Sequence, residues 1–397
     1  MLKGGRGREV QHPPVSPILV SIRSRALQAE PMNTEYFRSP LADFHLSHGA
    51  TLGTYHGAEV PARFSDACAE HQAVRTACGL FDLSFRACFA VKGKDAIRFM
   101  HRMVSNDVQS LAPGEGVYAA LLTAQGRIVA DMRVYRLDDG LWVETDADLR
   151  TKLMESLRRY IIGDKVEVVP LDLYPVGFEG PQARGLLEKT LHVDVPPLGE
   201  YGHFATNYAG FPVRVARASN TGEEGYAVWV SAKGLMGVWG GACGQSPTYG
   251  MLPCGVEALE TLRIEAGIPR YGSELGEDTL PHEARLMNAL SFTKGCYVGQ
   301  EIVERTRSRG HVNWLLAGLF VDSATPPPPG SKLLAEGKEA GEITSACISP
   351  TLGRTLALAY LRRELSEVGT KLALDSGASA EVTALPFYSR QASSTVP

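Results

Sequence analysis

The sequence predicts an α+β protein that ends in a small β-barrel. Over the first two thirds of the chain, amphipathic helices alternate with apolar, β-rich segments that pair as hairpins. This pattern is typical of α+β domains and not of a doubly wound parallel sheet. From about residue 316, short strands separated by glycine-rich turns replace the alternation, and the prolines at 326–329 mark a rigid turn. Short strands at this spacing predict a small barrel.

Length and composition limit the class of protein. The chain has 397 residues, enough for two to three domains, and its 44% hydrophobic and 21% charged residues are ordinary for a globular protein. The net charge of −4 does not favour nucleic acid as a partner. No apolar run reaches the length of a membrane span.

Cysteine usage argues against a structural metal site. None of the seven cysteines forms a C-x-x-C pair, and no histidine lies at zinc-finger spacing from one. We therefore expect no bound metal. An odd number of cysteines in a long chain also fits a reducing compartment better than a disulfide framework.

The first 31 residues differ from the rest, with five basic residues against two acidic ones and several prolines. Three interpretations are open: an organelle presequence, a disordered tail, or an over-extended start with Met32 as the true first residue. We favour the last two together, because amphipathic periodicity is poor and Met32 opens the first well-patterned segment. The expected location is then the bacterial cytoplasm; a presequence would instead indicate the mitochondrial matrix.

The first predicted domain spans residues 32–170. Its clearest signal is a hairpin, because two apolar, β-rich runs meet at Gln125 and Gly126. We expect helices at 65–78, 94–104 and 147–162, and strands at 87–91, 117–124, 127–137, 141–144 and 165–169.

The second predicted domain spans residues 171–312, and the barrel spans 313–390. In the second domain we expect helices at 181–191, 232–239 and 254–266, and strands at 211–216 and 226–230. In the barrel we expect strands at 315–320, 342–347, 355–360, 371–374 and 380–384.

The octapeptide KGCYVGQE at 294–301 is the most informative segment for chemistry. Gly295 and Gly299 favour a turn around Cys296, which would expose the thiol. A positive charge on Lys294 would favour the reactive thiolate. The alternative is a surface turn in which the cysteine is incidental, since most cysteines are small buried residues.

Basic residues follow this segment at every second position: Arg305, Arg307, Arg309 and His311. In an extended chain, side chains at this spacing lie on one face. Such a stripe suits a phosphate, a polycarboxylate tail or an acidic partner protein. The alternative is a solvated edge strand that uses charge to prevent aggregation.

Three further positions carry polar groups in informative places. Asp131 interrupts the apolar second strand of the hairpin, so it is either buried with a partner or functional. Glu223 and Glu224 lie in a turn that enters a strand, and ordinary turn chemistry also explains them. Arg263 lies near the end of a helix, where it can simply interact with the helix dipole.

Taken together, these segments resemble the folate-binding YgfZ family, relatives of the glycine cleavage T-protein (aminomethyltransferase). The octapeptide resembles the YgfZ signature. The resemblance extends from about residue 36 to 390 and includes GLFDLS at 79–84, NDV at 106–108, GRIVAD at 126–131, RIEAGIP at 263–269 and the segment 316–385.

The resemblance implies a three-domain ring around a central channel that holds tetrahydrofolate. Arg263 would contact the folate, and Glu223 or Glu224 would lie beside it. The same resemblance assigns Asp131, Tyr297, Gln300 and Glu301 to the cofactor site, with Cys296 and Lys294 as the reactive pair.

One difference from the T-protein pattern favours the YgfZ branch over the T-protein branch. The T-protein pattern has paired aspartates after the hairpin turn, and the first is Ala130 here. We therefore expect an accessory protein that supports assembly or repair of iron–sulfur clusters in client enzymes, some of them tRNA-modifying, and not an enzyme. Its protein partners would bind through Arg305, Arg307 and Arg309, without nucleic acid or membrane, to a monomer.

Three alternatives remain open. The first is a folate-dependent aminomethyltransferase of the T-protein type, which transfers a methylene group from a lipoyl-bound aminomethyl group to tetrahydrofolate. The second is a folate-dependent demethylating enzyme that acts on a small amine or methyl ether. The third is an adaptor for cluster-assembly proteins that does not need folate.

Overall fold

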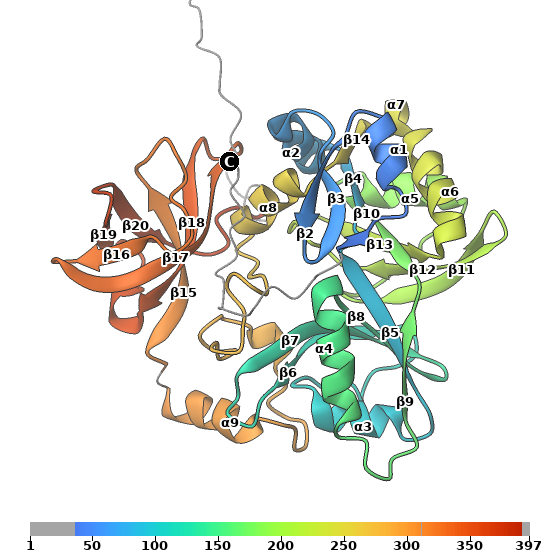
Figure 1. The fold of residues 1–397 in the computed structure, drawn as a ribbon, viewed down its shortest axis with the longest axis horizontal. Helices are drawn as coiled ribbons and strands as arrows, with labels where there is room; N and C mark the ends of the chain where they lie inside the picture. The colour runs from blue at the N-terminus through green and yellow to red at the C-terminus, as the bar shows by residue number, and fades with distance from the viewer. Residues whose placement is uncertain (1–35, 311, 391–397) are drawn as a thin grey trace, which may run out of the picture.

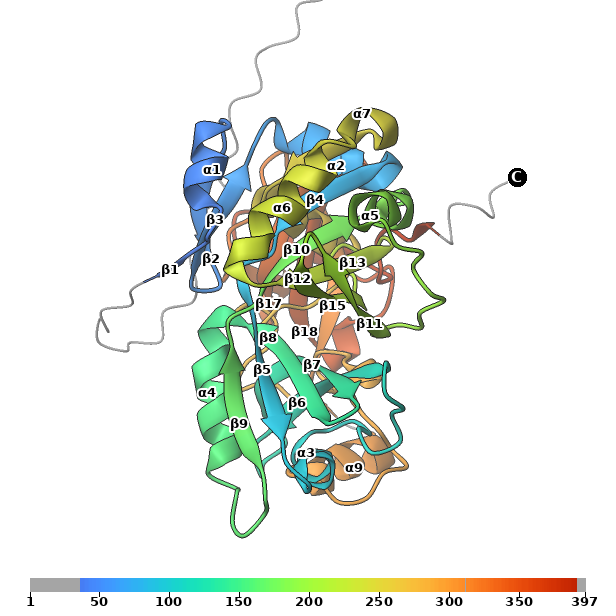
Figure 2. The same cartoon turned by 90° about the vertical axis from the view of Figure 1, so that its right-hand side faces the viewer.

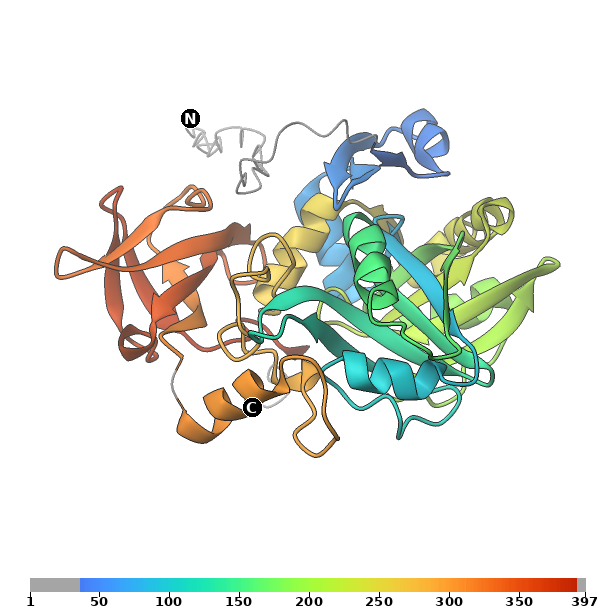
Figure 3. The ribbon, with the colours of Figure 1, turned by 60° about the horizontal axis from the view of Figure 1, so that its bottom comes forward.

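The computed structural model describes residues 36–310 and 312–390, and its chain forms an α+β body joined to a separate barrel (Figures 1 and 3). The predicted properties of residues 1–31 and of His311 lie outside these ranges. Within them, no helix combines the length and the apolar character that a membrane crossing requires.

The N-terminal segment adds a small three-stranded sheet, of order β1-β3-β2, to the body. Its elements are β1 (Phe37–Arg38), α1 (Ala42–Ser47), β2 (Thr51–Tyr55) and β3 (Ala58–Arg63). Asp82 ties α1 to the next sheet, because it accepts a hydrogen bond from Ser39 at 2.5 Å and lies 3.0 Å from His45 Nε2. All three side chains are buried.

A six-stranded sheet of order β11-β12-β13-β10-β4-β14 forms the upper half of the body. Its strands are β4 (Cys78–Asp82), β10 (Tyr174–Glu179), β11 (His203–Tyr208), β12 (Phe211–Arg217), β13 (Gly225–Val230) and β14 (Met251–Cys254). The helices that accompany it are α2 (Ala67–Thr76), α5 (Ala183–Leu191), α6 (Ala232–Cys243) and α7 (Ser246–Tyr249). Leu187 of α5 and Trp239 of α6 pack on Phe178 and Val228 of the sheet in one apolar core.

The lower half of the body is a five-stranded antiparallel sheet of order β6-β7-β8-β5-β9 (Figure 2). Its strands are β5 (Arg86–Lys92), β6 (Gly116–Leu122), β7 (Ile128–Leu137), β8 (Gly140–Asp146) and β9 (Glu167–Leu171), with helices α3 (Ala96–Met103) and α4 (Ala147–Arg158). One face packs on α3 and α4 through residues such as Phe99 and Leu153. The opposite face meets the six-stranded sheet through Trp142 and Trp229, whose rings are 5.1 Å apart.

The C-terminal segment closes into a six-stranded barrel of order β15-β18-β17-β16-β19-β20. Its strands are β15 (Trp314–Val321), β16 (Lys332–Ala335), β17 (Lys338–Ser349), β18 (Arg354–Arg362), β19 (Lys371–Leu374) and β20 (Ser379–Thr383). Helix α8 (Val256–Glu265) lies between the barrel and the body (Figure 1). Ile264 of α8 packs on Leu316, Leu356 and Leu358 of the barrel.

The predicted α+β class with a terminal barrel is confirmed, but two local predictions differ from the structure. The stretch with Arg305 and Arg307 is helix α9 (Gln300–Arg309) and not an extended chain, so these residues do not form a strand-like stripe. An ion pair of 2.7 Å between Glu301 and Arg305, one turn apart, supports that helix. The predicted boundary at residue 170 also divides one sheet. Strand β4 lies in the first predicted domain but pairs with β10 and β14 of the second.

Gly255 allows α8 to begin close to strand β3. It is the N-cap of the helix, and its backbone N–H donates a 2.8 Å hydrogen bond to buried Glu70. A Cβ atom here would lie 2.1 Å from the carbonyl oxygen of Ala62. Backbone cannot yield as a flexible side chain can, so the close approach of α8 to β3 depends on glycine.

Replacing Gly255 with alanine should therefore lower the free energy of unfolding by about 1–3 kcal/mol through overpacking. Chemical denaturation would measure this. Gly276→Ala is the matched control, because a Cβ atom at Gly276 would meet nothing within 4 Å. Equal stability of the two variants would show that α8 does not need this close approach.

Candidate functional site

The inner face of the five-stranded sheet carries the candidate site. Side chains alternate between the two faces of a strand. On β7, Ala130 and Met132 point into the apolar core beneath α3 and α4. Asp131 and Arg133 therefore point to the opposite face, toward the six-stranded sheet.

Asp131 accepts a hydrogen bond of 2.9 Å from the hydroxyl of Tyr118 on β6. Burial raises the pKa of the Asp131 carboxyl, and the negative charge of Asp146 raises it further, against the opposing effect of Arg86. Burial and the neighbouring carboxylate likewise raise the pKa of Tyr118 well above its usual value.

Arg86, at the start of β5, contributes to the difference in pKa between Asp131 and Asp146. Its Nη1 donates to Asp146 and its Nε donates to Glu144 at 2.9 Å. Although burial opposes ionisation, the charges of His56 and Arg86 lower the pKa of Asp146. The half-buried carboxyl of Asp131, with a raised pKa, thus lies near the buried carboxyl of Asp146, with a lowered pKa, a pairing typical of acid–base chemistry.

Arg263 is fully engaged by protein groups. Its guanidinium contacts Glu260 and Glu274, each at 2.9 Å, and donates to Ser345 of β17 at 2.6 Å. Although burial opposes it, the charges of Arg263 and Arg270 lower the pKa of Glu260 to about 2. Arg263 therefore joins α8 to the barrel through its hydrogen bond to Ser345, while its buried ion pairs hold Glu260 of the same helix and Glu274 of the following loop.

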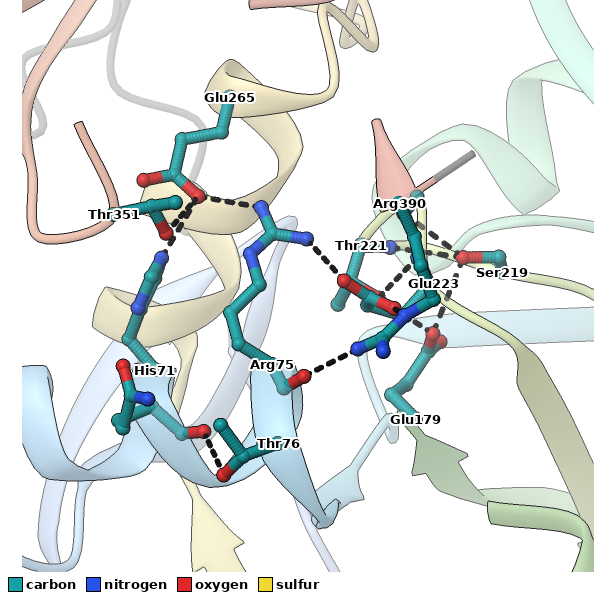
Figure 4. A network of polar contacts seen from close by, with 12 residues as sticks. His71, Arg75, Thr76, Glu179, Ser219, Thr221, Glu223, Glu265, Thr351 and Arg390 are labelled. Carbon is teal, nitrogen blue, oxygen red and sulfur yellow. Dashed lines mark hydrogen bonds and ion pairs between the residues drawn. The ribbon is translucent and has the colours of Figure 1, made fainter. Parts of the chain in front are cut away.

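A second buried cluster lies around Arg75 of α2 (Figure 4). Arg75 donates to Glu223 at 2.8 Å and to Glu265, at the end of α8, at 2.5 Å. Glu223 also accepts a 2.6 Å hydrogen bond from Arg390 near the end of the described chain. The guanidinium of Arg75 lies 4.1 Å from the ring centre of Tyr388. The cluster thus joins α2, α8, the turn before β13 and the C-terminal segment.

Glu179, the last residue of β10, holds the turn that carries Glu223. Its carboxylate accepts from the backbone and side-chain nitrogens of Asn220 at 3.0 and 2.9 Å, and from the hydroxyls of Thr221 and Ser219 at 2.8 and 3.2 Å. Burial raises the pKa of Glu179 to about 7.

Arg133 connects the two clusters. It donates at 2.8 Å to Glu144 on the inner face, and at 3.0 and 2.9 Å to Ser219 and Asn220 in the turn. Glu224, predicted beside Glu223, instead accepts a hydrogen bond from Tyr226 at 2.7 Å. Of the two adjacent glutamates, only Glu223 joins the cluster around Arg75.

Lys294 serves a structural contact in the octapeptide. Its ammonium is buried and donates to the backbone oxygens of His101, Val104 and Asn106, the last two at 2.7 and 2.9 Å. Burial lowers the pKa of Lys294 to about 8. The three hydrogen bonds hold the segment against the end of α3, while Cys296 remains exposed.

The rest of the octapeptide packs on the tip of the β6–β7 hairpin. Tyr297 is 6% exposed and lies in an apolar cluster with Leu122 and Ile128. Gln300 begins α9, and Glu301 is exposed and paired with Arg305. Hydrogen bonds of the described residues join none of these side chains to Asp131 or Arg263.

Sequence reasoning missed most of the site. Tyr118, Asp146 and Glu260 occupy ordinary positions on strands and a helix, and four arginines complete the set: Arg75, Arg86, Arg133 and Arg390. The available signal was a charged residue on the inner face of an otherwise apolar strand. That signal identified Asp131 and applies equally to Arg133 and Glu144.

Comparisons with known proteins place the whole chain. The family model of the GCVT N-terminal domain matches residues 41–294, and that of the glycine cleavage T-protein C-terminal barrel domain matches residues 315–389. The aminomethyltransferase of Streptomyces coelicolor is 34% identical over 371 residues, which cover 90% of this chain and 99% of that one. The aminomethyltransferase of Bacillus subtilis is 31% identical over 360 residues, with coverages of 89% and 99%.

A solved structure supports the fold. The glycine cleavage system aminomethyltransferase T from Bartonella henselae superposes with a TM-score of 0.83 at 23% identity, covering 89% of this chain and 98% of that one. The three-domain T-protein-like architecture predicted from the resemblance is therefore confirmed. The matches support the T-protein superfamily and do not single out its YgfZ branch.

The predicted role as an accessory protein for iron–sulfur clusters is wrong. Relatives that match about nine tenths of the chain at 31–34% identity are named aminomethyltransferases. The argument from Ala130 fails for a physical reason, because that position points into the apolar core and the retained Asp131 faces the site. The chain belongs to the glycine cleavage T-protein family.

Proposed function

We propose that this protein is a tetrahydrofolate-dependent one-carbon transferase of the aminomethyltransferase type. The single observation that carries the proposal is the half-buried carboxyl of Asp131, held by Tyr118 on the inner face of the sheet. The names of the relatives supply the reaction class, and tetrahydrofolate is the cofactor of this family, as the resemblance implied.

The residues of the site fit a folate. A pteridine ring presents hydrogen-bond donors beside acceptors, so carboxylates and guanidinium groups together can bind it. Asp131 and Glu223 provide the carboxylates; Arg75, and Arg270 beside Glu260, provide the guanidinium groups. Among the described residues, the Nε atoms of Arg75 and Arg270 are buried without a hydrogen-bond partner, so donors remain for a ligand.

The proposed reaction moves one carbon from a lipoyl-bound aminomethyl group. The C–S and C–N bonds of the donor break, and two C–N bonds to the folate form. The folate loses the protons of its two reacting N–H groups, one to the departing ammonia and one to the departing lipoyl thiol. Tetrahydrofolate supplies the two nitrogens that accept the carbon. Asp131 can hold or accept a proton beside them, because burial keeps its pKa raised.

We further propose that the chain is a YgfZ-like member of the family by sequence, on the strength of the octapeptide at 294–301. This assignment concerns ancestry alone. It adds no second activity to the proposed transfer reaction.

Asp131→Asn should lower the rate of methylene-tetrahydrofolate formation from an aminomethylated lipoyl carrier by at least about 100-fold, because the amide cannot hold the transferred proton. Thermal unfolding would show that the variant still folds. The control is Asp43→Asn, at an exposed carboxylate that forms an ion pair with Arg38. A variant as fast as the unmodified protein would refute the role of Asp131.

Ala130→Asp restores the paired aspartates by sequence and should not raise activity. It should instead lower the free energy of unfolding by about 3 kcal/mol or more, because it places an unpaired carboxylate in the apolar core under α3 and α4. Denaturant titration and the same rate assay would test this. A stable variant with a higher rate would restore Ala130 as a functional position.

Glu179→Gln tests the turn that carries Glu223. The pKa of Glu179 is about 7 in the folded protein and about 4.3 in the unfolded chain, so folded protein binds the proton more tightly. Its contribution to stability is fully present below about pH 4 and is lost as the pH rises through 7. The glutamine variant should lack this loss, so its free energy of unfolding should change less between pH 5 and 8 than that of the unmodified protein.

Unfolding measured between pH 5 and 8 gives the comparison. Glu224→Gln, which changes the neighbouring glutamate of the same turn, is the control and should keep the original pH profile. An unchanged profile in Glu179→Gln would show that this carboxyl does not titrate in the window.

A further inference from the structure

Three potential metal ligands converge beside the inner face, although no metal site was predicted from the sequence. Nδ1 of His56 lies 3.2 Å from Oδ2 of Asp146 and 3.4 Å from Oδ2 of Asp148. All three ligand atoms lie within 4.8 Å of one another. Ligands about 2.1 Å from a common ion are separated by about 3.0–3.4 Å, so this spacing suits one cation between them.

Each of the three residues is brought there by a defined element. His56 occupies the turn between β2 and β3 with a left-handed backbone, φ 45°. Gly57 follows it, where a Cβ atom would lie 3.1 Å from Cβ of Asp148, so the turn packs directly on the start of α4. Asp146 ends β8 and is the N-cap residue of α4.

The His56 ring is held in place but lacks a hydrogen bond. Its side chain is 6% exposed and packs edge-on against Tyr55 at 4.7 Å. Its Nδ1 lies within ion-pair distance of both carboxylates, and among the described residues neither contact has the geometry of a hydrogen bond. An imidazole nitrogen this close to two carboxylate oxygens offers a cation one nitrogen and two oxygen ligands.

Asp146 is also free to coordinate. An aspartate at an N-cap usually accepts from the first backbone N–H groups of its helix, but this side chain makes no such bond. Arg86 binds Oδ1 instead and leaves Oδ2 toward His56. Such an outer contact orients a ligand as it does in known metal centres. Asp148 is 43% exposed, which leaves one side of the site open to water.

We propose that His56, Asp146 and Asp148 bind one divalent first-row transition-metal ion. One imidazole and two carboxylates form the mixed nitrogen and oxygen ligand set that such ions accept, and the open side supplies water or a substrate atom. This proposal is independent of the proposed transfer reaction. Its test measures metal binding in the absence of folate, so either proposal can fail without the other.

The test is titration of chelator-treated, full-length protein with Co²⁺, followed by its visible absorption and by calorimetry. One ion should bind without a thiolate charge-transfer band, which excludes Cys296 and Cys68 as ligands. Affinity should fall at least about tenfold in Asp148→Asn and in His56→Gln. Asp148→Asn changes a partly exposed residue, so its folding is not at risk.

The matched control is Asp107→Asn. His101 Nδ1 lies 3.2 Å from Asp107, so this pair reproduces one edge of the site, and no third potential ligand joins it among the residues that the structure describes. The control should bind Co²⁺ as the unmodified protein does. Absence of saturable binding, a thiolate band, or equal affinity in Asp148→Asn would overturn the proposal and leave His56 in contact with the two carboxylates alone.

Discussion

Charged groups can be buried between the sheets and the barrel only when each has a partner, and this constraint shapes the centre of the molecule. Burying an unpaired charge costs several kcal/mol, and removing one member of a buried pair leaves that cost uncompensated. Arg75 satisfies Glu223 and Glu265 together, and Arg263 satisfies Glu260 and Glu274. Helix α8 carries members of both sets, so it fixes the barrel relative to the body.

The same need for partners determines the proton affinity of Asp131. Its nearest described hydrogen-bond donor is a tyrosine and not a cation, while Asp146 has Arg86 in direct contact. Two carboxyls on one sheet face therefore differ in proton affinity because their partners differ. A site that must manage protons during one-carbon transfer needs such a difference.

Much of the fold could be predicted from local patterns, because helical and strand periodicities are properties of short segments. The hairpin of β6 and β7, helices α2 and α4 and every barrel strand except β16 followed from them. The small sheet of β1–β3 and the pairing of β4 with β10 and β14 did not, because pairing between distant segments leaves no local trace. The basic segment after residue 300 was misjudged, since alternate arginines fit a strand while the Glu301–Arg305 pair supports a helix.

For the site, Asp131, Glu223 and Arg263 could be identified as important positions, but their contacts could not. The octapeptide drew attention to Cys296 and away from Asp131, and only the alternation of β7 shows why Ala130 is a core residue. A core position for Ala130 is consistent with the names of the relatives. It also removes the argument that the missing first aspartate excludes transfer chemistry.

The proposed transfer of one carbon to tetrahydrofolate can be tested by mixing the unmodified protein with tetrahydrofolate and an aminomethylated lipoyl carrier, and quantifying methylene-tetrahydrofolate and ammonia together. Both products should form in equal amounts, and only when protein and folate are present. Normal folate binding with no ammonia release would refute the proposed reaction.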